Sequence, residues 1–352
     1  MLKAWYRLIS AEKLNVAGYP AMAILKALAC LYRYAVCRRN DRFDRRLNES
    51  VMISRPVLSV GNITAGGTGK TPIVILLCEM FNDAGLKVAV LTRGYAAKDG
   101  FADEPEEIKL ACPSAKVYVN PSRVKGAEEA LAAGPPDIFV MDDGYQHRQL
   151  HRDINLLVID ASCPFGFGRL LPAGLLREPL SSIGRADICF ITKGEMVSEE
   201  RLGEIEQQVH SIKNIPIVRT RQAPAKAVLL DGTTLSPAEL CGKKAFAFCG
   251  IGNPKSFFNM LRNAGIELAC TKAFPDHYSY SAEEIKQMLY KAGNVDIILM
   301  TRKDYVKVSR LSDDAEIAKA SGKMGYIELG LKITKNSDAL SDVLLKIGEM
   351  TL

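Results

Sequence analysis

The sequence predicts an α/β protein built on a mostly parallel sheet, because short apolar runs alternate with helical segments from about residue 56 onward. The runs are VLSV (57–60), KVAVLTRGY (87–95), DIFVMDD (137–143), INLLVID (154–160) and ADICFITKG (186–194). The third and fourth are continuously apolar and end in carboxylates, as strands covered on both faces do. We therefore expect functional side chains at the carboxyl ends of these strands.

The 352 residues are enough for about two domains. The alternation breaks at the proline-containing stretch 216–227 and resumes with AFAFCG (245–250) and VDIILMT (295–301). The expected parts are an N-terminal basic helix at 1–48, a core domain at 49–220 and a second, smaller α/β domain at 221–352. The nine cysteines include no C-x-x-C pair, which indicates reduced thiols in a cytosolic protein.

Residues 19–37 predict a helix lying in a membrane interface. The segment is apolar except for Lys26 and Arg33, which are seven residues apart and so share one stripe of the helix. These cations disfavour a spanning helix, which needs roughly 20 apolar residues. The first 50 residues carry ten lysines and arginines against four acidic residues, which accounts for the whole net charge of +6. This local excess favours an anionic membrane surface over nucleic acid as a partner. A core-packed or hairpin helix is the alternative.

The stretch SVGNITAGGTGKTPIV (59–74) predicts a phosphate loop, because it lies between an apolar strand and a helix expected at about 71–84. Glycines let backbone N–H groups approach phosphate oxygens, while Lys70 would reach the β- and γ-phosphates and Thr71 would bind Mg²⁺. The predicted cradle is Thr64, Ala65, Gly66, Gly67, Thr68, Gly69, Lys70 and Thr71. Thr64 stands where the general pattern G-x-x-x-x-G-K-[ST] has glycine, at a position that turns the chain and does not touch phosphate.

A phosphate loop needs a second magnesium anchor, normally an aspartate at the end of an apolar strand. Asp142 and Asp143 both qualify. A GTPase is a live alternative, because TKGE (192–195) and TRKD (301–304) each approach the guanine-reading pattern [NT]-K-x-D without matching it fully. A membrane-surface scaffold with a degenerate nucleotide site is a third hypothesis.

Three further polar clusters indicate a phosphate acceptor. They are DDGYQHRQLHRD (142–153), GRLLPAGLLREPL (168–180) and FPDHYSYS (274–281). Each has a simpler interpretation: a solvated turn, a loop, and a helix start where Ser281 and Glu284 form a capping box. Together with the phosphate loop, LTRGY, DEP (103–105) and GIGNP (250–254), they resemble the tetraacyldisaccharide 4'-kinase family over about residues 15–310. Thr64 is that family's own form of the loop.

The resemblance implies a P-loop NTPase-like core that transfers the γ-phosphate of ATP, with Mg²⁺, to the 4'-hydroxyl of a tetraacylated glucosamine disaccharide 1-phosphate. This reaction belongs to lipid A biosynthesis and takes place on the cytoplasmic face of the bacterial inner membrane. The lipid disaccharide and the anionic membrane surface are therefore the expected partners, whereas no protein partner is indicated. The acyl chains would be held by the membrane and the N-terminal helix.

The resemblance also implies residue roles. Asp103 matches the catalytic base for the sugar hydroxyl, His277 matches its partner, and Lys70 assists the transfer. Asp142 and Asp143 match the carboxylates on the magnesium side, with Thr71. The residues expected to line the substrate site are Arg123, Gln146, His147, Arg177 and Glu178. With Asp103 in the first domain and His277 in the second, we expect domain closure to assemble the site and exclude water.

Overall fold

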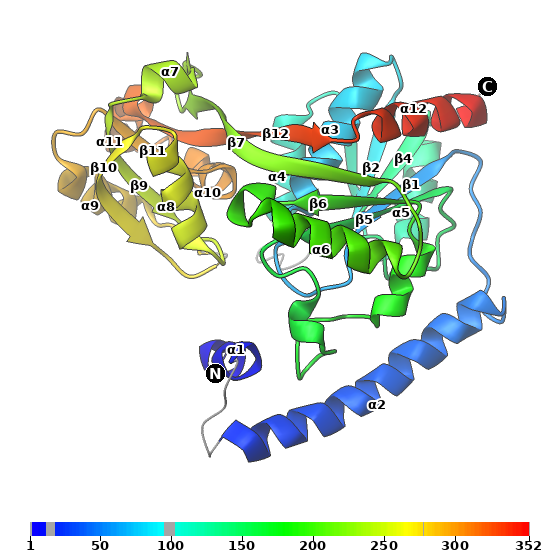
Figure 1. Cartoon of the computed structure of the whole chain (residues 1–352). Coiled ribbons are helices and arrows are strands. Elements are labelled where there is room, and N and C mark those ends of the chain that lie inside the picture. Colours follow the sequence, from blue (N-terminus) through cyan, green and yellow to red (C-terminus); the bar gives the residue numbers. More distant parts are fainter. Residues whose placement is uncertain (1, 12–17, 95–102, 277, 352) are drawn as a thin grey trace. The chain divides into compact units, whose positions relative to one another are not determined.

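The computed structural model describes residues 2–11, 18–94, 103–276 and 278–351. The chain forms two compact units, which are considered separately (Figure 1). The first comprises residues 1–93, 112–221 and 333–352, and the second comprises 94–111 and 222–332.

Two segments fall differently from the sequence expectation. Residues 94–111, expected in the core domain, group with the second unit, where helix α4 (Asp103–Ala111) packs against α10 (Arg302–Val308). Residues 333–352, expected in the second domain, group with the first unit, where Lys335 pairs with Glu206. Both differences arise from packing between segments far apart in the chain.

The first unit is built on a parallel sheet in the order β6-β5-β1-β4-β2-β3. Its strands are β1 (Val57–Gly61), β2 (Val88–Thr92), β3 (Lys116–Val119), β4 (Ile138–Asp142), β5 (Ile154–Asp160) and β6 (Ile188–Thr192). Every residue of β1, β2, β4, β5 and β6 is buried, so the central sheet is covered on both faces. The central strand β1 lies between β4 and β5, and its Val60 stands opposite Asp142.

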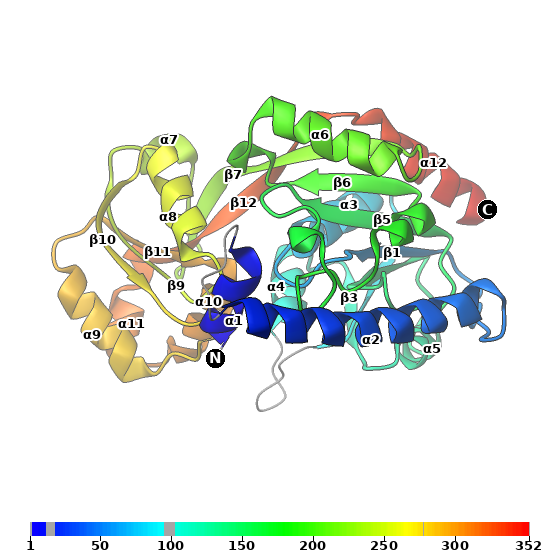
Figure 2. The same ribbon diagram turned by 60° about the horizontal axis from the view of Figure 1, so that its bottom comes forward.

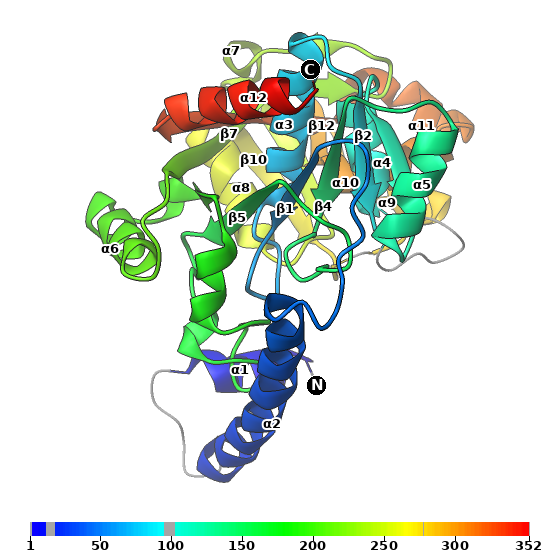
Figure 3. The same cartoon turned by 90° about the vertical axis from the view of Figure 1, so that its right-hand side faces the viewer.

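The helices of the first unit are α1 (Leu2–Ser10), α2 (Gly18–Asp44), α3 (Lys70–Asp83), α5 (Arg123–Ala132), α6 (Glu199–His210) and α12 (Asp338–Thr351). Helix α3 packs against β1, β2 and β4, and α5 packs against β2 and β3 (Figure 3). The N-terminal part, expected as one helix at 1–48, contains the two helices α1 and α2.

The second unit contains a smaller parallel arrangement in the order β10-β9-β11-β12. Its strands are β9 (Lys244–Cys249), β10 (Glu267–Ala273) and β11 (Ile297–Thr301), with the short β8 (Thr234–Leu235) antiparallel to β7. Its helices are α4, α7 (Pro237–Leu240), α8 (Pro254–Asn263), α9 (Ala282–Ala292), α10 and α11 (Ala315–Lys319). Strands β7 (Ile217–Leu229) and β12 (Met324–Lys335) carry the chain between the units. The predicted α/β class with a mostly parallel sheet is confirmed.

Helix α2 is longer than the predicted helix at 19–37 and runs beside α1 at its start (Figure 2). In the part of the chain that the structure describes, α2 alone is long and apolar enough to cross a membrane. The buried helices of soluble proteins and N-terminal signal sequences pass the same test of length and composition. The buried positions of α2 include Met22, Val36 and Asn40. The large apolar side chains that it exposes are Tyr19, Ile24, Leu28, Leu31 and Tyr34. The helix is therefore packed along one side and apolar along another.

Candidate active site

The predicted phosphate loop occupies the expected place, between the central strand β1 and helix α3. Gly66 and Gly69 have φ values of 119° and 80°, which residues with side chains rarely adopt. A Cβ added at Gly66 or Gly67 would meet nothing within 4 Å, so the loop leaves open space beside its backbone. The side-chain oxygen of Thr68 is buried with no hydrogen-bond partner in the described part of the chain. An open backbone and an unused hydroxyl at a helix N-terminus fit a phosphate group.

Thr64 lies in extended backbone paired with the segment 170–178. It forms an antiparallel bridge with Leu176, and the N–H of Ala65 donates to the carbonyl of Leu175 at 2.6 Å. On the other side of the bridge, the N–H of Arg177 donates to the carbonyl of Ile63 at 2.7 Å. A β-paired position suits threonine better than glycine, which explains the departure from the general pattern.

Lys70 begins α3 and points to two oxygen acceptors. Its Nζ lies 3.2 Å from Oδ1 of Asp143 and 3.4 Å from Oδ1 of Asn62. Asp143 also accepts from Nη1 of Arg177 at 3.1 Å. Burial by itself would raise the pKa of Asp143, but Lys70 and Arg177 outweigh that effect and lower the pKa. Asp143 is therefore held as a carboxylate between two cations.

Asp142 ends β4, directly beside β1, and is only 2% exposed. Its Oδ2 accepts from Oγ1 of Thr92 at 3.3 Å. Arg123 is 3% exposed and donates from Nη2 to the backbone carbonyl of Asp142 at 3.0 Å. The buried guanidinium thus supports the end of the strand that carries Asp142.

Gln146 and His147 occupy the turn after β4. The side-chain amide of Gln146 donates to the backbone carbonyl of Asn62 at 2.7 Å, which ties this turn to the phosphate loop. Burial, together with Arg123 and Arg152, lowers the pKa of His147 to about 4. His147 is therefore neutral at physiological pH.

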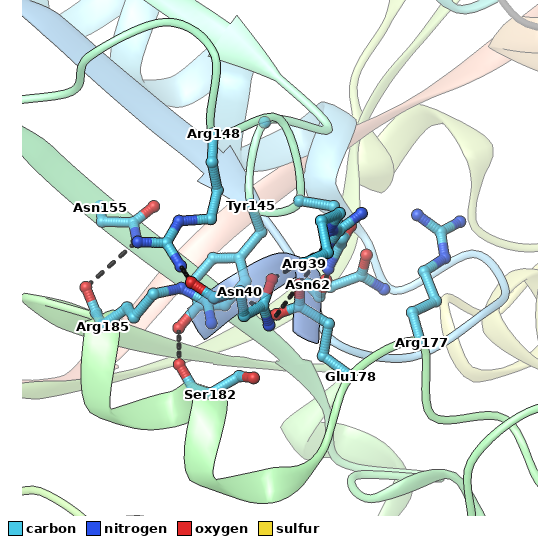
Figure 4. A network of polar contacts seen from close by, with 12 residues as sticks. Arg39, Asn40, Asn62, Tyr145, Arg148, Asn155, Arg177, Glu178, Ser182 and Arg185 are labelled. Atoms are coloured by element: carbon cyan, nitrogen blue, oxygen red, sulfur yellow. Dashed lines mark hydrogen bonds and ion pairs between the residues drawn. The ribbon is translucent and has the colours of Figure 1, made fainter. Parts of the chain in front are cut away.

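Arg177 and Glu178 are neighbours in sequence whose side chains diverge (Figure 4). Arg177 reaches Asp143 beside Lys70. Glu178 is completely buried and is paired with Arg39 of α2 and with Arg185. The structure thus brings Arg177 to the phosphate loop and directs Glu178 away, into the packing of α2.

Asp103 is the first residue of α4, and its side chain lies outside the described part of the structure, as does His277 altogether. Asp103 belongs to the second unit. The sequence expectation placed Asp103 in the first domain, whereas α4 groups with the second unit.

Sequence reasoning missed several residues that support the phosphate loop. Thr192 donates from Oγ1 to the carbonyl of Thr68 at 2.7 Å. Lys193 donates from Nζ to the carbonyl of Gly67 at 2.8 Å and pairs with Asp160. The signal was available, because Asp160 and Thr192 end the strands β5 and β6, at the same edge of the sheet as the loop.

The chain is similar to known proteins over most of its length. A family model for tetraacyldisaccharide-1-P 4'-kinase matches residues 21–348. The chain is 36% identical over 324 residues to the tetraacyldisaccharide 4'-kinase of Geobacter sulfurreducens, covering 87% of this chain and 89% of that protein. It is 31% identical over 362 residues to the protein of the same name from Anaeromyxobacter sp. (strain K), covering 97% and 93%.

A solved structure shows that the similarity includes the fold. LpxK from Aquifex aeolicus, whose crystal structure was determined in complex with ATP, matches with a TM-score of 0.73 and 28% sequence identity, covering 93% of this chain and 99% of that one. The resemblance inferred from the motifs is confirmed over both compact units. The chain belongs to the tetraacyldisaccharide-1-P 4'-kinase family.

Proposed function

We propose that the chain transfers the γ-phosphate of ATP to the 4'-hydroxyl of a tetraacyldisaccharide 1-phosphate, and that the loop at 64–71 holds the phosphates. Membership of the family makes the chain an ATP-dependent 4'-kinase of lipid A biosynthesis, as the sequence predicted. The ATP complex of the Aquifex relative supports ATP as the donor here. The GTPase alternative loses its support, because the family model and the curated relatives are kinases and the Aquifex structure was determined with ATP.

The observation that carries the proposal is the placement of Lys70. The lysine stands at the N-terminus of α3, where the helix dipole and the open loop backbone both favour an anion. Asp143 and Asn62 hold its ammonium group in place. A bound triphosphate would meet a fixed cation, and the lysine would stabilise the charge on the transferring phosphoryl group.

The residues near the loop also fit Mg²⁺, which prefers oxygen ligands. Thr71 supplies a hydroxyl in the first turn of α3, and Asp142 supplies a carboxylate at the end of the neighbouring strand β4. Asp142 suits the metal better than Asp143, whose two oxygens are both engaged by cations. When bound, Mg²⁺ would neutralise charge on the β- and γ-phosphates.

The acceptor side of the reaction is assigned to the remaining predicted residues. Asp103 would accept the proton of the sugar hydroxyl as it attacks, with His277 orienting the carboxylate. Arg177 is the substrate-lining candidate with the strongest support, because it already forms part of the Asp143–Lys70 cluster. Gln146 and His147 occupy the adjoining turn, and His147 would act there as a neutral group.

Localisation at the cytoplasmic face of the inner membrane, by surface attachment, completes the proposal. The family acts on a lipid, and α2 exposes an apolar side that includes Leu28 and Leu31. Other positions of the helix are tied to the protein: Tyr32 donates to the carbonyl of Arg177, and Arg39 pairs with Glu178. A helix held along one side favours lying on the membrane over crossing it.

Replacing the proposed base tests this assignment. Asp103→Asn should lower phosphate transfer by about 100-fold or more, because general base catalysis is worth that much, while leaving ATP affinity within about twofold. Glu106→Gln, which removes a carboxylate from the same helix, is the matched control and should retain activity. Transfer is measured with labelled ATP and the lipid disaccharide, and ATP affinity by calorimetry with a non-hydrolysable analogue. Undiminished transfer by Asp103→Asn would remove Asp103 from the mechanism.

A further inference from the structure

The segment 170–178 contacts both the phosphate loop and the N-terminal helices. Along one edge it pairs with the loop through the Thr64–Leu176 bridge and the backbone hydrogen bonds beside it. Along the other it receives hydrogen bonds from α1 and α2: Trp5 donates to the carbonyl of Pro172 at 2.8 Å, and Tyr32 donates to the carbonyl of Arg177 at 2.9 Å. The segment is therefore a direct structural link between the helices and the nucleotide site.

Glu178 binds the end of this segment to α2. Its Oε1 accepts from Arg39 at 2.7 Å and from Asn40 at 3.3 Å, both on α2. Its Oε2 accepts from Arg185, whose guanidinium lies over the ring of Tyr145 (Figure 4). The carboxylate is completely buried, and both of its oxygens are occupied by the protein. It is thus engaged as a structural anion and not presented to a ligand.

A buried carboxylate needs its cationic partners, because an unpaired charge in the interior is strongly unfavourable. Helix α2 and Glu178 are therefore held together. The residue before Glu178 carries the connection onward: Arg177 holds Asp143, and Asp143 holds Lys70. An apolar cluster supports the same path, since Ala65 of the loop packs against a buried group that includes Leu175 and also Met22 of α2.

We propose that Glu178 and Arg39 are positioning residues for ATP, through which helix α2 fixes the phosphate loop and Lys70. This replaces the expectation that Glu178 lines the substrate site. It rests on the proposed function only in that the loop at 64–71 binds the phosphates of ATP. The position of α2 then determines the affinity for ATP as well as the attachment of the protein to its lipid surface.

Two neighbouring arginines provide the test. Arg39→Met removes the cation that pairs with Glu178, whereas Arg38→Met removes the same charge from an exposed position whose guanidinium lies 3.5 Å from the Tyr34 hydroxyl. Both variants weaken attraction to an anionic surface equally, so the difference between their KM values for ATP measures the effect of the Arg39–Glu178 pair alone. We expect Arg39→Met to raise the KM for ATP about threefold to thirtyfold over Arg38→Met, the usual range for coupling through a packed network. The KM for the lipid should be equal in the two.

Three further variants sharpen the result. Glu178→Gln keeps the shape but not the charge and should raise the KM for ATP with little change in the KM for the lipid. Tyr32→Phe removes only the hydrogen bond to Arg177 and should act in the same direction, less strongly. Arg39→Lys should recover part of the ATP affinity, since it restores the positive charge.

The proposal is overturned if Arg39→Met and Arg38→Met have equal KM values for ATP, or if Glu178→Gln changes only the KM for the lipid. If Glu178→Gln does not fold, the Arg39 and Tyr32 variants decide. The full-length wild-type protein, assayed in parallel, distinguishes failure of the proposed function from failure of the positioning role. Absence of lipid phosphorylation by the wild-type protein counts against the proposed function. Binding of a non-hydrolysable ATP analogue without lipid still tests the link.

Discussion

At the scale of single residues, Thr64 shows how one side chain can depart from a motif and keep its function. The position is 4% exposed, and its backbone is paired with Leu176. Its Oγ1 also lies 3.4 Å from Nδ2 of Asn62. The side-chain oxygen of Asn62, like that of Asp143, contacts the ammonium group of Lys70. The glycine of the general pattern would gain conformational freedom here and lose packing.

Thr64→Gly should therefore weaken the loop, although it restores the general motif. Glycine in a paired, extended position is destabilising by about 1 kcal/mol, and a looser loop should raise the KM for ATP. Urea unfolding and steady-state kinetics measure the two effects. Thr64→Val, which keeps the β-branched shape and removes the hydroxyl, is the control and should stay closer to wild type in both. An improved KM for ATP in Thr64→Gly would contradict the structural role of the bridge.

At the scale of secondary-structure elements, α2 has two tasks on different sides. Tyr32, Arg39 and Asn40 bind the segment 177–178. Leu28 and Leu31 are exposed and apolar, as expected of a surface that meets acyl chains. The two tasks should be separable by mutation.

Leu31→Asp should release the protein from vesicles that contain anionic phospholipid. Leu31 is 69% exposed, and loss of its burial in the membrane together with an added negative charge should lower the vesicle partition coefficient at least about tenfold. Leu345→Asp on α12, where the leucine is 68% exposed, is the matched control and should bind vesicles like wild type. Cosedimentation gives the bound fraction. Equal binding by the Leu31 and Leu345 variants would show that this side of α2 is not the attachment surface.

At the scale of the whole molecule, local patterns predicted what depends on local geometry. The strand–loop–helix order around Lys70, the carboxylates that end the strands, and the capping box of Ser281 and Glu284 were all predicted correctly from the sequence. These features depend on residues a few positions apart, where spacing determines structure.

Pairings between distant segments could not be predicted in this way. The bridge from Thr64 to Leu176, the pairing of Glu178 with Arg39, and the packing of α4 on α10 each join residues more than 100 positions apart. No periodic pattern of residues in the sequence indicates such contacts. The pair of Glu178 with Arg39 and the grouping of α4 with the second unit were therefore not predicted, although Glu178 and Asp103 both lie in motifs that had been recognised.

Transfer of label from γ-labelled ATP to the lipid tests the central claim most directly. The full-length protein is incubated with the tetraacyldisaccharide 1-phosphate or with an analogue that lacks the 4'-hydroxyl, and the lipid phase is counted. The account predicts label in the lipid only when the 4'-hydroxyl is present, and a loss of about 100-fold or more in Lys70→Met, because the lysine stabilises the transferred phosphoryl group. Label that appears only as inorganic phosphate, equal labelling of the analogue, or full activity in Lys70→Met would contradict it.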